Sequence, residues 1–206
     1  MAGFYLWHNS VKCDPDHVMY QFESLDYGKG KFIHFDDWNI IIYPKKNYNI
    51  VNWKIYPDGI ICGVGTFSYK GRFYDNALET IFHDVKHNCL RSTDFWGTFI
   101  IIVVTSNGNY LIRDGAGLTR LYRHRKNKIF SSSFAGLIAN SDKCFSFDRD
   151  AATELLTTGV LTGDQTLLKE IKRIIKGNDV DSFKVIETYP ESLPEPLNRN
   201  QALDQQ

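Results

Sequence analysis

The sequence lacks a net charge, a long apolar run and a secretory signal. Its 24 lysines and arginines balance 24 aspartates and glutamates, so no overall field favours a nucleic acid or a membrane as partner. The apolar segment 100–105 is far shorter than a bilayer span. Residues 1–20 lack the basic start and apolar stretch of a signal peptide. We therefore expect a soluble, cytoplasmic protein with no membrane partner and no nucleic-acid partner.

Cysteine is also scarce, and the four that occur, at positions 13, 62, 89 and 144, lie far apart. None belongs to a C-x-x-C pair, so the spacing indicates reduced, mostly buried thiols. A chain of 206 residues buries roughly 70% of the surface that it exposes when unfolded. Its core therefore needs neither a disulfide nor a metal, and we expect no metal site.

Aromatic residues are abundant, at 14% of the chain, which favours a strand-rich fold. Apolar runs at 4–7, 39–43 and 59–64 predict strands, and the β-branched segment 99–105 predicts a strand buried on both faces. Asn107-Gly108 predicts a hairpin that returns through 110–113. Segments 121–125 and 129–132 predict a second hairpin. This antiparallel meander indicates the α+β class.

Three helices are predicted. In segment 76–88, Asn76 and Glu79 form the pattern of a capping box. Its apolar stripe has helical spacing and consists of Leu78, Ile81, Phe82 and Val85. The other two helices are predicted over 151–157 and 165–175.

Three prolines within seven residues, at 190, 194 and 196, indicate a linker. We therefore expect one domain over 1–188. Residues 189–206 are expected to form a linker and the start of a following domain.

The most informative segments are LIRDGAGLTRLY, SSSFAGLIA and GVLTGDQTLLKEI, all within 110–174. Their order and spacing resemble the end of the type 2 glutamine amidotransferase domain of the asparagine synthetase and beta-lactam synthetase family. The likeness extends more weakly over most of residues 1–190. It implies an N-terminal-nucleophile hydrolase fold, in which two stacked antiparallel β-sheets are flanked by helices.

The same resemblance shows three vacated catalytic positions. The family begins M-C-G, whereas this chain begins Met1-Ala2-Gly3, which places Ala2 at the nucleophile. Val64 stands where the family has the asparagine that steadies the oxyanion, and Gly65 is a remnant of that motif. Ala77 replaces the aspartate that holds the substrate's amino group. One oxyanion donor is worth about 3 kcal/mol of barrier, so these losses imply an inactive glutaminase. The arginine for the substrate carboxylate falls within 45–54, where its position is undecided.

The resemblance therefore implies a structural or dimerising domain of an ATP-dependent, amide-forming protein. Its expected partners are a C-terminal synthetase domain, a synthetase subunit or a second copy of the chain. ATP and Mg would belong to a following synthetase domain, and no cofactor is expected in this chain. Two alternatives stay open: a free-standing binding or regulatory protein on the same scaffold, and a glutaminase with an unorthodox nucleophile or an engineered Cys→Ala change at Ala2.

Two charged motifs are interpreted as non-catalytic. Arg113-Asp114 resembles the family's R-D pair, and we expect a buried ion pair that supports a sheet corner. The residues Arg120, Arg123, Arg125 and Lys126 form a basic stretch. It is typical of a solvated sheet edge, and it is also the best candidate for a partner surface.

Two further patterns have simple structural interpretations. His83 and His87 lie one helical turn apart in H-D-V-K-H, which imitates a zinc motif. With Asp84 in place of glutamate, we expect two polar-face histidines instead. Gly63, Gly65 and Gly71 lack the spacing of a phosphate loop, and close strand packing explains them better.

Overall fold

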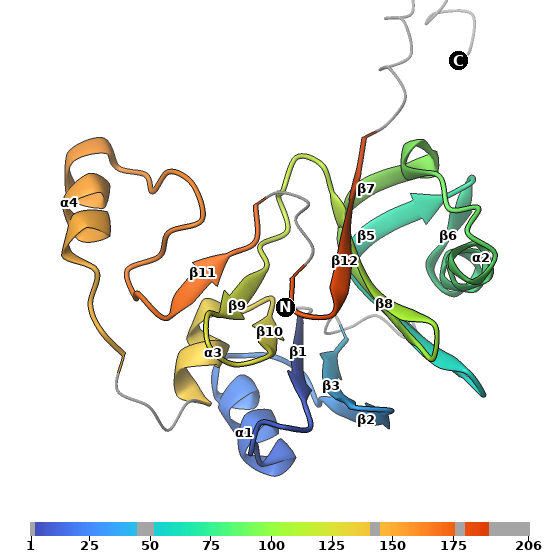
Figure 1. The fold of residues 1–206 in the computed structure, drawn as a ribbon, viewed down its shortest axis with the longest axis horizontal. Coiled ribbons are helices and arrows are strands. Elements are labelled where there is room, and N and C mark those ends of the chain that lie inside the picture. The colour runs from blue at the N-terminus through green and yellow to red at the C-terminus, as the bar shows by residue number, and fades with distance from the viewer. Residues whose placement is uncertain (1–2, 45–51, 141–144, 176–179, 190–206) are drawn as a thin grey trace, which may run out of the picture.

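The structure, a computed structural model, describes residues 3–44, 52–140, 145–175 and 180–189. The chain forms two six-stranded sheets stacked face to face, with helices on their outer faces (Figure 1). The predicted α+β class and the two-sheet sandwich flanked by helices are confirmed.

The first sheet contains the N-terminal strand in an interior position. All its neighbouring pairs are antiparallel. Its strands, in spatial order, are β11 (Ile171–Arg173), β9 (Tyr122–His124), β10 (Ile129–Ser131), β1 (Gly3–His8), β3 (Trp38–Tyr43) and β2 (Lys31–Phe35). The predicted hairpin about residues 126–128 is confirmed as β9 and β10.

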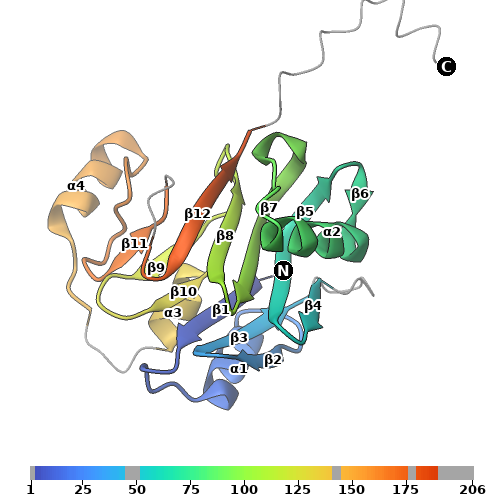
Figure 2. The ribbon, with the colours of Figure 1, turned by 45° about the vertical axis from the view of Figure 1, so that its right-hand side comes forward.

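The second sheet carries the long central hairpin. Its strands, in order, are β12 (Phe183–Thr188), β8 (Gly108–Asp114), β7 (Phe95–Thr105), β5 (Gly59–Tyr69) and β4 (Trp53–Tyr56), and β6 (Arg72–Phe73) pairs with β5. The hairpin predicted at Asn107-Gly108 joins β7 to β8. The expectation of purely antiparallel sheets is wrong at one edge, because β12 lies parallel to β8 (Figure 2).

Four α-helices and one short 3₁₀ helix occur in the described part of the chain. They are α1 (Pro15–Ser24), α2 (Tyr74–Lys86), η1 (Ser92–Asp94), α3 (Phe134–Ala139) and α4 (Arg149–Thr158). Helices α1 and α3 cover the first sheet and α2 covers the second, whereas α4 extends from one end of the molecule (Figures 1 and 2).

Buried side chains form three apolar layers. The central layer lies between the sheets, a second lies between the second sheet and α2, and a third lies between the first sheet and helices α1 and α3. Side chains alternate along a strand, so Phe4 and Leu6 of β1 enter the central layer while Tyr5 and Trp7 enter the third. This double burial explains the continuous apolar runs of β1 and β7.

The stripe predicted for α2 is buried as expected, but its predicted start is wrong. The helix begins at Tyr74 and no side chain caps it. Asn76 is exposed within its first turn, and Glu79 forms an ion pair with Lys54 at 2.9 Å instead of closing a capping box. The short β5–β6 hairpin leads the chain directly into the helix, which therefore starts earlier than the capping pattern predicts.

The helix predicted over 165–175 is also wrong, because this segment ends in strand β11. The Thr166 hydroxyl donates to the carbonyl oxygen of Ile171 at 2.7 Å and accepts from the Leu168 amide at 3.1 Å. Such bonds replace the helical ladder. Ile171 then pairs with His124 of β9, so tertiary pairing overrides the apolar spacing. The helix predicted over 151–157 is confirmed as α4.

Candidate functional site

Two positions to which the family resemblance assigns catalytic roles, Val64 and Ala77, do not converge. Val64 of β5 is buried in the central layer, whereas Ala77 of α2 is buried in the layer between α2 and the second sheet. The two layers lie on opposite faces of this sheet, so the two side chains face different surroundings. Ala2 lies outside the described residues, as do positions 45–51 of the segment in which the carboxylate-binding arginine was expected.

Gly65 has a packing role. Its φ is +105°, and a Cβ there would lie 2.1 Å from the carbonyl oxygen of Thr98 on β7. Gly97 of β7 has the reciprocal relation, with a φ of +118° and 2.1 Å to the carbonyl oxygen of Thr66. Only glycine accepts both the positive φ and this close approach. The interpretation of Gly65 as a residue for close strand packing is therefore confirmed.

Cys62 is the thiol closest in sequence to these positions, two residues before Val64. It belongs to the central layer, and burial raises its pKa to about 12. A thiol with this pKa holds only about one thiolate per 10⁵ molecules at neutral pH. Cys62 is thus a protonated core residue without the character of a nucleophile.

Arg113 and Asp114 are buried, as expected, but they do not form the expected ion pair. Adjacent strand residues point to opposite faces, and each makes its own contacts. A carboxylate oxygen of Asp114 accepts from the Leu118 amide at 2.9 Å, and the other accepts from the Thr119 amide at 3.2 Å. The Arg113 guanidinium donates to the carbonyl of Ile174. Asp114 therefore holds the backbone of the corner after β8, whereas Arg113 holds the backbone that directly follows β11.

A polar network around Asp84 was missed by sequence reasoning. One carboxylate oxygen accepts from the Tyr69 hydroxyl and from Lys70 Nζ, both at 2.7 Å, and the other accepts from Cys89 Sγ at 3.3 Å. Burial alone would raise the pKa of Asp84, but these hydrogen bonds and one to His83 lower it well below its ordinary value. The available signal was helical spacing, since position 84 lies three residues after buried Ile81.

The histidine pair of α2 agrees with its simple interpretation. His83 and His87 are both exposed and their rings stack with centroids 4.1 Å apart. Among the residues that the structure describes, no group of three or more His, Cys, Asp or Glu side chains is arranged to hold a metal ion.

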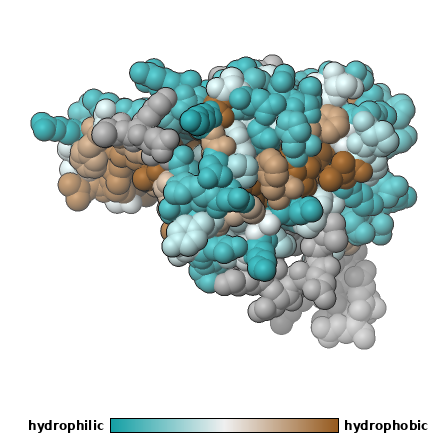
Figure 3. Space-filling view, turned by 90° about the horizontal axis from the view of Figure 1, so that it is seen from below, coloured by the Kyte–Doolittle hydropathy of each residue, from teal (hydrophilic) through white to brown (hydrophobic). Residues whose placement is uncertain are grey.

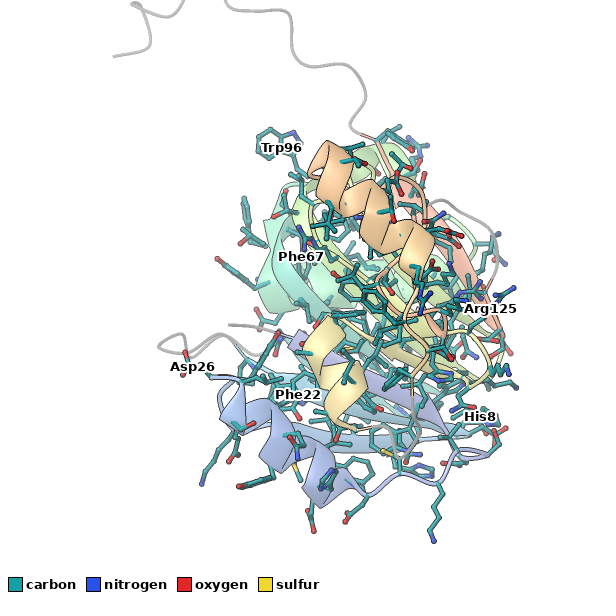
Figure 4. The ribbon with its side chains drawn as sticks, turned by 90° about the vertical axis from the view of Figure 1, so that its left-hand side faces the viewer. His8, Phe22, Asp26, Phe67, Trp96 and Arg125 are labelled. Atoms are coloured by element: carbon teal, nitrogen blue, oxygen red, sulfur yellow. The ribbon has the colours of Figure 1, made fainter. Side chains whose placement is uncertain are left out.

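Of the four residues in the basic stretch, Arg120 lines a pocket, and the other three are not among the lining residues of that pocket. Arg123 lies between Tyr122 and His124 on β9 and points to the opposite face from them. Arg125 and Lys126 are exposed in the following turn, and Figure 4 shows Arg125 at the edge of the molecule. His124 Nδ1 accepts the Lys126 amide at 3.3 Å, which fixes the turn. Arg120 has a separate environment.

Arg120 lines a pocket of about 430 Å³ at the α4 end of the molecule. Arg173 of β11 lies in the same lining, together with Phe134 of α3. The remaining wall comes from α4 and the chain after it, through Leu155, Val160 and Leu161. This volume is within the usual range of small-molecule sites, about 300–1,000 Å³.

Among the described residues, the lining of the pocket combines two arginines with an apolar wall and includes no acidic residue. Carboxylates close to it in sequence have other partners. Glu154 accepts from the Thr162 amide at 3.1 Å, Glu170 accepts from the Ser146 amide at 2.9 Å, and Asp164 pairs with Lys172 at 3.9 Å. Within the described residues, the side chains of Arg120 and Arg173 make no hydrogen bond or ion pair. The site is thus electropositive and apolar at once.

No α-helix in the described ranges combines the length and the apolar character needed to cross a bilayer. Comparison of the sequence with protein-family models and with curated proteins finds no match.

Proposed function

We propose that this chain is a glutamine amidotransferase-like domain that does not hydrolyse glutamine and serves a structural or dimerising role beside an ATP-dependent, amide-forming synthetase. One observation carries the proposal: the positions that the resemblance assigns to the oxyanion donor and to the aspartate hold Val64 and Ala77, which are buried apolar residues. The two-sheet architecture is compatible with the scaffold that the sequence resembles.

The chemistry of amide hydrolysis supports the same conclusion. A nucleophile must lie within hydrogen-bond reach of a base, and donors must point at the developing oxyanion. Val64 offers a hydrocarbon where that donor is needed. Cys62 is protonated and sealed in the central layer. The described residues near these positions therefore supply neither the attack on a carbonyl carbon nor its stabilisation.

A glutaminase assay tests the catalytic part of the proposal. The purified chain and its Ala2→Cys variant are incubated with glutamine, and glutamate and ammonia are measured against a heat-inactivated control. We expect neither protein to exceed the control. Turnover by the unchanged chain would establish an unorthodox glutaminase. Turnover by the cysteine variant alone would show that only the nucleophile is missing and would favour a mutated amidotransferase.

The structural part of the proposal is tested by asking whether the chain dimerises and whether a synthetase domain follows it. Light scattering of the purified chain measures whether it forms a dimer. A phosphate-binding S-G-G-x-D-S motif in the reading frame after residue 206 would support a synthetase domain in the same protein. A monomer followed by a stop codon would contradict both and would favour the second candidate, a free-standing binding protein on this scaffold. The pocket at Arg120 and Arg173 is the observation that favours that candidate.

A further inference from the structure

We propose that the pocket lined by Arg120 and Arg173 binds a small organic oxyacid, meaning a carboxylate or phosphate monoester attached to a short apolar body. This inference goes beyond the function proposed above, and it holds whether or not the chain acts beside a synthetase.

Charge selects the head group of the ligand. Two arginines line one cavity, and none of its described lining residues is acidic. The guanidinium is planar and its parallel N–H groups match the two oxygens of a carboxylate or a phosphate. Glu154, Glu170 and Asp164, which are close in sequence to this wall, already accept other donors. An anionic ligand would therefore supply the acceptors that the described residues do not give to the two arginines.

The apolar wall selects the body of the ligand. Leu155, Val160 and Leu161 line the same cavity as the arginines, and its lining also includes Tyr122, Phe134 and Leu167. Val160 is 60% exposed, so a ligand that covers it removes apolar surface from water. Figure 3 shows apolar surface at this end of the molecule, where α4 lies. A bare anion would leave this surface uncovered.

The wall is fixed in place before any ligand arrives. Helix α4 ends at Gly159, which has a φ of +77° and donates its amide to the carbonyl of Leu155 at 2.9 Å. Two residues beyond Val160, Thr162 donates its amide to Glu154 at 3.1 Å. The Arg173 amide donates to the carbonyl of Asp164 at 2.8 Å, which ties the same loop to β11. Preorganisation of this kind lowers the entropy cost of binding.

The size of the site favours a small molecule over a macromolecule. A volume of about 430 Å³ suits a compact ligand, whereas a stable protein interface covers roughly 800 Å² on each partner. Binding of single-stranded nucleic acid depends on a basic groove with aromatic stacking surfaces. Arg125 and Lys126 are not among the described lining residues, and Figure 4 shows Arg125 at the edge of the molecule.

Calorimetric titration of the full chain tests the proposal. The probes are octanoate and octyl phosphate, with 1-octanol and inorganic phosphate as controls that lack the charge or the apolar body. We expect saturable binding of at least one amphiphilic anion, at least tenfold tighter than either control. The anion that binds more tightly shows whether the pocket prefers a carboxylate or a phosphate head group.

Three matched variants locate the binding. Arg120→Gln and Arg173→Gln should each weaken the anion at least fivefold, while Arg125→Gln should leave its affinity unchanged. Thermal unfolding of each variant confirms that it is folded. Absence of saturable binding, equal affinity for 1-octanol, or an equal loss in Arg125→Gln would each overturn the proposal. None of these results depends on glutamine hydrolysis or on the oligomeric state.

Discussion

Helices α2 and α4 are both amphipathic, but the structure uses them differently. The apolar stripe of α2 is buried against the second sheet, and Asp84 on the same helix is enclosed by donors. In α4 only Ala151 is buried, and Leu156 is 86% exposed. The apolar side chains at the α2 end are therefore covered by the sheet, and its buried charge has hydrogen-bond donors around it. The α4 end is exposed and lies beside a pocket whose described lining residues include two arginines and no acidic residue. Apolar periodicity predicts a helix, but it does not tell whether the apolar face is covered.

The largest expected difference between the two helices is in the free energy of unfolding that is lost when one apolar side chain of each is shortened. Ile81→Ala removes a fully buried side chain and should lower the free energy of unfolding by about 3 kcal/mol. Leu156→Ala should change it by less than about 0.5 kcal/mol. Urea denaturation of both variants measures the difference. Equal losses would show that α4 packs as tightly as α2 and would remove the contrast.

Removal of the buried charge should have a somewhat smaller effect. Asp84→Asn keeps the size of the side chain but weakens its bonds to Tyr69 and Lys70, so we expect a loss of about 2 kcal/mol. The control is Asp58→Asn, because Asp58 pairs with Lys86 near the surface and such pairs contribute less than about 1 kcal/mol. Chemical denaturation at pH 7 compares them. A larger loss in the Asp58 variant would contradict the importance of burial at Asp84.

The same carboxylate, that of Asp84, should also make the free energy of unfolding depend on pH in the acid range. Because the pKa of Asp84 is lower in the folded state, its charge stabilises the fold above the unfolded pKa of about 3.9. This contribution is lost as the pH falls below that value toward the folded pKa. From pH 5 to pH 3 the wild-type chain should lose on the order of 1 kcal/mol more than Asp84→Asn. If the free energy of unfolding of the two proteins falls equally with pH, Asp84 is not the source of the acid dependence.

Much of the fold could be predicted because its signals are local. The double-sided burial of β7 and the Asn-Gly turn of the β7–β8 hairpin are each predicted by a short run of consecutive residues. The parallel pairing of β12 with β8 is a contact between distant segments, and no local pattern specifies it. Local patterns also fail for the segment before β11. Its structure depends on the hydrogen bond of the Thr166 hydroxyl and on the pairing of β11 with the edge of β9.

The site was less predictable than the fold. The sequence pattern groups Arg120 with its neighbours Arg123 and Arg125, which are not among the lining residues of the pocket. Its partner in the pocket is Arg173, and only the pairing of β11 with β9 brings the two together. The sequence around Asp84 does not reveal its network, because Tyr69 and Lys70 come from β5 and the turn after it. In both cases, the missing information is which chain segments meet in space.

The interior position of β1 in its sheet has a consequence for synthesis. One of its neighbours, β10, follows far later in the chain, and the bond from the Ser131 hydroxyl to the Phe4 carbonyl joins residues 127 positions apart. Until β10 has left the ribosome, an apolar strand has one unpaired edge. Open edges of this kind invite pairing with other chains. The nascent protein should therefore depend on holding chaperones for most of its translation.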